Sequence, residues 1–140
     1  MENIEYSRRG YLHEDFRLFH LKDNLGDEAE YHYHEFDKAV IFISGRVNYM
    51  IEGVTYPLRP WDVLLISNHI VHKALIDTGD IYERAVIYIN PDFAEGSSSD
   101  KTELRRCFKD AESRRFYLLR PDIEQQGLIS SALSDLEREL

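Results

Sequence analysis

The chain has 140 residues, which is enough for one compact domain. Its formal net charge of −9 makes it a poor binder of nucleic acid, because an acidic surface repels phosphate groups. The longest purely apolar stretch, residues 39–43, is far shorter than the roughly 20 residues that span a bilayer. A single cysteine excludes an internal disulfide and a multi-cysteine zinc site. We therefore expect a cytoplasmic domain that has no membrane partner.

Residues 14–90 predict a series of short strands. This stretch is rich in Val, Ile, Phe and Tyr and is divided by turn residues, with a tight hairpin turn expected at Glu52-Gly53. Short strands without intervening helices favour an antiparallel sandwich or barrel, and a closed barrel leaves no exposed sheet edges. The expected strands lie near residues 16–21, 38–44, 47–51, 54–58, 63–66, 71–77 and 81–90.

Residues 96–140 predict helices. The stretch Glu95-Gly-Ser-Ser-Ser99 is typical of a flexible connection, so we divide the chain into a body, residues 1–95, and a tail, residues 96–140. Asp100 and Glu103 have the spacing of a capping box, and Cys107 is interpreted as a small core residue on the helix that follows. A second helix is expected to begin at Pro121-Asp122. Its apolar stripe comprises Ile129, Ala132, Leu133, Leu136 and Leu140.

Three histidines form a candidate cluster. His32 and His34 are two residues apart on an expected strand, so their side chains share a face, and Lys38 has the same parity. His72 lies on a later strand. A pair of imidazoles at this spacing can present two metal ligands from a sheet. The alternative is a polar wall or a hydrogen-bonded pair in the core.

The spacing of several residues resembles the cupin motifs. Gly26, His32-Tyr33-His34, Lys38 and Gly45 follow the spacing of the first motif, although Lys38 stands where the family has an acidic ligand. The second motif is looser. His72 matches its histidine, Trp61 stands where a Pro-Gly-Asp turn usually has glycine, and Ile76 stands where the motif normally has asparagine.

Further segments resemble the N-terminal sensing domain of AraC-type transcriptional regulators. The similarity extends over roughly residues 16–91, and the tail matches the dimerisation helices of that family more weakly. It implies a double-stranded antiparallel β-barrel (cupin, jelly-roll-like) followed by two C-terminal helices. It also implies helix-turn-helix units beyond Leu140, through which the intact regulator contacts DNA. The similar segments are Tyr31–Asp37, Ile43–Gly45, Leu58–Asp62, Tyr82–Arg84 and Tyr88–Pro91.

The predicted function is the sensing of a small-molecule effector. Lys38 and the histidines would form a cationic pocket that suits a sugar or an organic anion, and aromatic walls with a fork-shaped cation suit the same ligands. The alternatives are that Lys38 extends to the barrel rim and that the aromatic residues are ordinary packing. The candidate ligand-binding residues are His32, His34, Lys38, His72, Tyr49, Arg84 and Tyr88.

The alternative function is a metal-dependent cupin enzyme, either a dioxygenase or an isomerase. His32, His34 and His72 would supply three ligands to Zn, Ni, Fe or Mn. The cation of Lys38 disfavours a divalent metal at the fourth position. Glu35 and Asp37 have the wrong parity to replace it unless a bulge intervenes.

The apolar stripe of the second helix predicts a two-fold homodimer. An isolated helix of about three turns is marginal in water, so the stripe must be buried on the barrel or on a partner helix. The polar outer face expected for the barrel favours the partner. We expect antiparallel helices that pack Leu133 and Leu136 across the axis. The predicted interface comprises Ile129, Leu133, Leu136 and Leu140.

Overall fold

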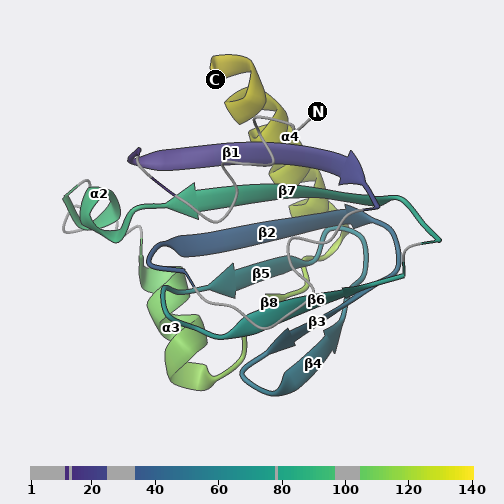
Figure 1. The fold of residues 1–140 in the computed structure, drawn as a ribbon. Coiled ribbons are helices and arrows are strands. Elements are labelled where there is room, and N and C mark those ends of the chain that lie inside the picture. The colour runs from purple at the N-terminus through teal and green to yellow at the C-terminus, as the bar shows by residue number, and fades with distance from the viewer. Residues whose placement is uncertain (1–11, 13, 25–33, 78, 97–104) are drawn as a thin grey trace, which may run out of the picture.

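The computed structural model shows two antiparallel sheets, followed by helices (Figure 1). It describes residues 12, 14–24, 34–77, 79–96 and 105–140. The strands are β1 (Phe16–Asp23), β2 (Asp37–Ser44), β3 (Val47–Ile51), β4 (Val54–Pro57), β5 (Val63–Ile66), β6 (His72–Ile76), β7 (Tyr82–Ile89) and β8 (Leu118–Leu119). The helices are α2 (Pro91–Gly96), α3 (Arg106–Arg114) and α4 (Ile123–Glu139).

The strand order confirms the antiparallel fold expected for residues 16–91. One sheet has the order β1-β7-β2-β5-β8, and the other has the order β4-β3-β6. β2 is central in the larger sheet, where Ala39 pairs with Ile87 on β7 and with Leu65 on β5. Its residues are buried on both faces as far as Phe42, because one face meets the opposite sheet, while on the other face Ile41 packs against α4 and Asp37 is bonded to Arg105. This double burial explains its continuous apolar run.

Two tight turns depend on backbone that favours glycine. Glu52 and Gly53 connect β3 to β4 with φ values of 49° and 80°, which confirms the expected hairpin turn. Gly45 follows β2 with φ of 125°, and a Cβ there would lie 2.9 Å from the carbonyl oxygen of Ile81. These turns hold the strand registers that place side chains between the sheets.

The tail is part of the same core as the body. Phe108, Ala111 and Tyr117 are buried in the main cluster between the sheets, and β8 pairs with β5 through Leu64 and Leu118. The division into a barrel and a purely helical appendage therefore differs from the structure. Gly96 ends α2, and Asp100 and Glu103 lie outside the described residues.

The two later helices begin differently. Asp122 caps α4, and its side chain accepts a hydrogen bond from the backbone N–H of Gln125 while the Gln125 side chain accepts one from the backbone N–H of Asp122. This capping box confirms the predicted start of the second helix. Cys107 on α3 is exposed, so its interpretation as a core residue is wrong. Within the described residues, no helix is long and apolar enough to cross a membrane.

Candidate functional site

Five candidate site residues converge between the two sheets. His34 precedes β2, Lys38 lies on β2, and Tyr88 stands directly opposite Lys38 on β7. Tyr49 on β3 and His72 on β6 come from the smaller sheet. We call these five residues the interior cluster. Its parts come from four strands and one loop, so the packing of the two sheets creates it.

Lys38 and Tyr49 form the polar centre of the interior cluster. Lys38 is only 1% exposed, and its Nζ donates a hydrogen bond to the Tyr49 hydroxyl at 3.2 Å. The ammonium group also lies 5.9 Å from the centre of the Tyr49 ring, within the range of a cation–π contact. Lys38 is therefore held inside the fold, and it does not extend to the rim.

The two histidines lie next to this pair. The His34 and His72 ring centres are 5.3 Å apart, and the Tyr49 ring stacks on His72 at 6.2 Å with an angle of 18°. His72 Nδ1 lies 2.8 Å from the Ile70 carbonyl oxygen. Because a carbonyl can only accept, Nδ1 carries the proton, and Nε2 of the neutral ring is then an acceptor.

Aromatic rings enclose one side of the interior cluster. Phe36 stacks on His34 with ring centres 4.6 Å apart and packs on Tyr88 at 4.3 Å. Phe19 meets the edge of Tyr88 at 5.2 Å. Phe36 was not among the candidate site residues, and its place beside His34 and Tyr88 makes it a wall of the cluster.

Arg84 lies elsewhere in the interior. It is four residues from Tyr88 along β7, about 13 Å at the rise of a strand. Its Nη1 donates to Asp23 Oδ1 at 2.7 Å and to the Tyr82 carbonyl at 2.9 Å, and its guanidinium lies 4.2 Å from the centre of the Tyr82 ring. These contacts place Arg84 in a separate group, and His32 lies outside the described residues.

The described donors do not fit a divalent metal. Within the part of the chain that the structure describes, no group of three His, Cys, Asp or Glu could hold a metal ion. His34 and His72 provide two imidazoles, and the Lys38 ammonium is bonded to the tyrosine that stacks on one of them. The positive charge of Lys38 beside these imidazoles repels a divalent metal ion. The three-histidine metal hypothesis depends on His32 and stays a prediction.

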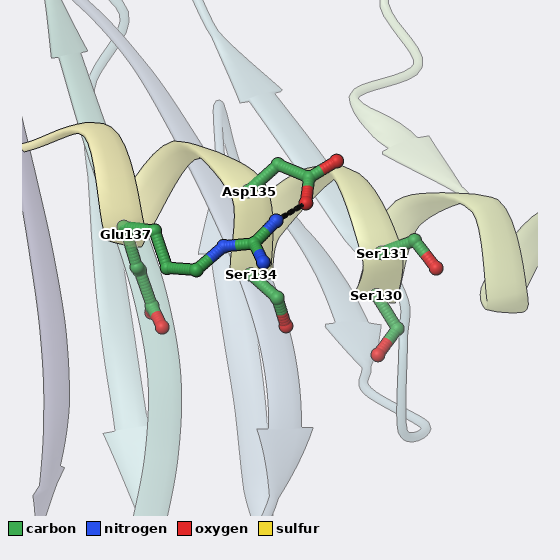
Figure 2. A pocket seen from close by; sticks show the side chains of 6 residues that line it. Ser130, Ser131, Ser134, Asp135 and Glu137 are labelled. Carbon is green, nitrogen blue, oxygen red and sulfur yellow. Dashed lines mark hydrogen bonds and ion pairs between the residues drawn. The ribbon is translucent and has the colours of Figure 1, made fainter.

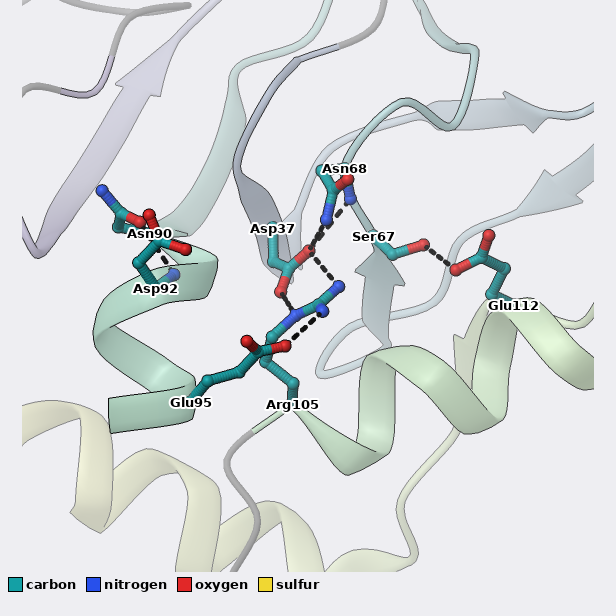
Figure 3. A network of polar contacts seen from close by, with 8 residues as sticks. All are labelled: Asp37, Ser67, Asn68, Asn90, Asp92, Glu95, Arg105 and Glu112. Carbon is teal, nitrogen blue, oxygen red and sulfur yellow. Dashed lines mark hydrogen bonds and ion pairs between the residues drawn. The ribbon is translucent and has the colours of Figure 1, made fainter. Parts of the chain in front are cut away.

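A polar network that the sequence did not indicate lies on the other face of β2 (Figure 3). Asp37 is fully buried, and Arg105 donates to it from Nε to Oδ2 at 2.6 Å and from Nη2 to Oδ1 at 3.3 Å. The backbone N–H and the side chain of Asn68 donate to Oδ1 at 2.9 and 3.1 Å. The hydrogen bond with Asp37 raises the pKa of Arg105, so the guanidinium stays charged. Strand parity alone indicated that Asp37 points away from Lys38.

The predicted dimer residues have a different neighbour in the single chain. Leu133 is 7% exposed and packs on Ile41 and Ala85, on the outer face of the larger sheet, with Ile129 partly buried beside it. Leu136 is also partly buried, whereas Leu140 is 64% exposed. Leu133 therefore faces its own domain, which differs from the expectation that it packs across a dimer axis, because the outer face of β2 and β7 is apolar.

A shallow polar hollow lies along α4 and includes Glu137, whose carboxylate contacts His20 on β1 (Figure 2). Ser130, Ser131 and Ser134 lie along it, and an ion pair joins Asp135 to Arg138. All its described lining groups belong to one exposed helix, and they indicate a solvated surface.

The two antiparallel sheets define a cupin-type class of domain. A model of the AraC-like ligand binding domain matches residues 20–140. The chain therefore belongs to the AraC-like ligand binding domain family.

Several solved structures are distantly similar to this chain. A cupin 2 conserved barrel domain protein from Salinispora arenicola CNS-205 is 15% identical, with a TM-score of 0.49 over 61% of this chain and 71% of that one. KdgF from Halomonas sp. is 22% identical, with a TM-score of 0.46 over 54% and 69%. A cupin protein from Bacteroides fragilis is 19% identical, with a TM-score of 0.46 over 62% and 70%. No curated protein matches the chain.

Proposed function

We propose that this domain senses a small-molecule effector for an AraC-type transcriptional regulator and binds it at the interior cluster. The observation that carries the proposal is the buried ammonium group of Lys38. It donates a hydrogen bond to Tyr49, and the Tyr49 ring stacks on His72. Burying a charge is costly, so an inward lysine among histidines and tyrosines is an expensive way to fill a core.

The chemistry of the cluster favours a sugar or an organic anion. The ammonium group of Lys38 and the two phenols offer hydrogen-bond donors that suit hydroxyl and carboxylate oxygens, and Nε2 of neutral His72 offers an acceptor for a hydroxyl group. Phe36 and Tyr88 supply flat apolar surfaces, which suit the faces of a sugar ring. The effector would shift the balance between two arrangements of the intact regulator, a cytoplasmic protein that contacts DNA through a domain beyond Leu140.

Thermal unfolding with a panel of sugars, sugar acids and short carboxylates tests the effector site. A ligand that binds only the folded state raises Tm with concentration. We expect at least one polar compound to do so for the parent protein and to lose its effect in Lys38→Met and Tyr49→Phe. Lys22→Met is the matched control, because Lys22 is exposed on β1. A ligand-induced shift that persists in Lys38→Met places the binding site elsewhere.

We also propose that the domain forms a homodimer through apolar surface beside α4. Because Leu133 packs on its own sheet, the surface left for a partner surrounds a hollow of about 410 Å³ between β8 and the start of α4. Leu119 and Leu128 on its border are 53% and 67% exposed. Exposed leucines around a hollow are typical of an interaction surface.

Light scattering across a concentration range tests the dimer. Leu128→Asp should give a monomer with unchanged stability, and Ser131→Asp on the polar side of α4 should leave the dimer intact. A parent protein that stays monomeric at high micromolar concentration would refute the proposal.

The metal-dependent enzyme is the second candidate, and the closeness of His34 and His72 favours it. Metal analysis of the parent protein and of His34→Ala separates the two functions. Stoichiometric metal in the parent that is lost in His34→Ala would support the enzyme. Equal metal content in the two proteins would exclude His34 as a required ligand.

A further inference from the structure

A second hollow lies between α3 and the β3–β4 turn, and its volume is about 650 Å³. Volumes of 300–1,000 Å³ are typical of small-molecule sites. Its apolar lining comes from three aliphatic residues. Ile51 is fully buried and Ile70 is 8% exposed, whereas Val54 is half-exposed on β4. The lining therefore offers a branched aliphatic group a place away from water.

Two carboxylates face this hollow from different elements. Glu52 in the β3–β4 turn accepts a hydrogen bond at Oε1 from the backbone N–H of Val71 at 3.1 Å. Glu112 on α3 accepts one at Oε2 from the Ser67 hydroxyl at 3.0 Å (Figure 3). Each bond engages one oxygen and fixes the direction of the carboxylate. The second oxygen of each can receive a donor from a ligand.

One phenol lines the hollow, and a second lies near the first. Tyr117 lines the hollow and is 3% exposed, and burial together with the charges of Glu52 and Glu112 raises the pKa of its hydroxyl, which stays protonated. Tyr56 is two residues from Val54 and shares its face of β4. Its hydroxyl is buried and has no hydrogen-bond partner among the described residues. A buried phenol without a partner is costly unless something else occupies its neighbourhood.

The charges select a cation. Glu52 and Glu112 give the hollow two negative charges, and Arg115 at the end of α3 adds one positive charge. A ligand with a single ammonium group neutralises the remainder. We propose that this hollow is a second binding site, distinct from the interior cluster, for a small molecule that carries a primary ammonium group and a branched aliphatic body.

A ligand in this hollow would lie against residues that contact the interior cluster. Ile51 pairs with His72 across β3 and β6, and the Ile70 carbonyl accepts the proton of His72 Nδ1. Both residues therefore connect the hollow to one imidazole of the cluster. The site would couple the amine to the orientation of His72.

Isothermal titration of the parent protein with isoamylamine, leucine and isovalerate tests the proposal. Isoamylamine carries the ammonium group alone, leucine adds a carboxylate that Arg115 could receive, and isovalerate has the same body with only the acid. We expect saturable binding of isoamylamine, of leucine, or of both, and none of isovalerate. If leucine is the tighter ligand, Arg115→Gln should weaken leucine and leave isoamylamine unchanged.

The variants Glu112→Gln and Glu52→Gln should each weaken amine binding at least tenfold, because an amide keeps the internal hydrogen bond and loses the charge. Glu124→Gln, exposed on α4, is the matched control and should bind as the parent does. Lys38→Met should also retain amine binding, which separates this site from the effector site. Absence of binding at millimolar amine, or binding that both glutamine variants retain, would overturn the proposal.

Discussion

Arg105 and Asp37 form a two-bonded ion pair that joins the start of α3 to the central strand of the larger sheet. The side chain of Asp37 is fully buried and that of Arg105 is 12% exposed. Arg120 makes an equivalent pair with Asp62, which is 1% exposed, through Nε to Oδ1 at 2.9 Å and Nη2 to Oδ2 at 2.8 Å. Two arginines of the tail thus hold two buried carboxylates of the body. These pairs therefore fix the starts of α3 and α4 to the sheets.

Removing Arg105 should destabilise the fold strongly. Arg105→Met leaves the buried Asp37 carboxylate without its cation, and breaking a buried pair costs about 3–5 kcal/mol. Urea denaturation of the parent and the variant measures this free energy of unfolding. Arg106→Met is the control, because Arg106 is 75% exposed and should change stability by less than about 0.5 kcal/mol. Equal effects of the two substitutions would contradict the structural role of Arg105.

Leu133→Ala should destabilise the single domain, whatever its oligomeric state. Its side chain fills the contact between α4 and the outer face of β2 and β7, and such truncations cost about 2–5 kcal/mol. Leu128→Ala should cost far less, because Leu128 is 67% exposed. Unfolding at low protein concentration, where a dimer dissociates, is the measurement. If Leu133→Ala lowers the free energy of unfolding only at high protein concentration, Leu133 packs across a dimer axis instead.

The strands were predictable because their sequence pattern is local. Buried runs such as Ala39–Phe42 and the turn at Glu52-Gly53 specify strand and hairpin without knowledge of the rest of the chain. β8 was not predictable, because two residues carry no periodicity and become a strand only by pairing with β5. The surface against which the apolar stripe of α4 packs could not be predicted from the sequence either. It depended on whether the outer face of β2 and β7 was polar or apolar.

The candidate site was predictable in part for the same reason. Parity and spacing are local, and they placed Lys38 and His34 in one group. The partner of Asp37 is 68 residues away in Arg105, so no local pattern could indicate it. Trp61 is a further case. It stands where the related motif has glycine and keeps the left-handed backbone, with φ of 71° and its N–H donating to the Phe42 carbonyl at 2.6 Å. The left-handed turn therefore forms at Trp61 without the glycine that the motif has at this position.

Two glycine substitutions should have opposite effects. Gly45→Ala places a Cβ 2.9 Å from the Ile81 carbonyl oxygen at a φ of 125°, where side chains are strained. We expect a loss of about 1–3 kcal/mol from backbone strain alone. Gly127→Ala lies inside α4 with open space around its Cβ, so it should gain up to about 1 kcal/mol. Thermal unfolding of both variants measures the signs, and a stabilised Gly45→Ala would contradict the geometry of the turn.

His20 should make the attachment of α4 dependent on pH. Its Nε2 lies 2.8 Å from Glu83 Oε2 on β7, and its Nδ1 lies 2.6 Å from Glu137 Oε1 on α4. Partial burial acts to lower the pKa of His20, but the hydrogen bonds and charges of the two glutamates outweigh it and raise the pKa above 6.5. The protonated ring can donate to both carboxylates at once, whereas the neutral ring can donate to only one.

A raised folded-state pKa fixes the direction of the effect. The contribution of His20 to the free energy of unfolding is fully present below pH 6.5, the pKa of histidine in the unfolded chain. It is lost as the pH rises through the raised pKa of the folded state. Because the side chain is 37% exposed, solvent screens the pair, and we expect only a few tenths of a kcal/mol. Urea denaturation between pH 6 and pH 9 should show the parent losing stability relative to His20→Gln. Glu137→Gln should reduce that difference, and a parent that gains stability relative to His20→Gln over this range would reverse the assignment.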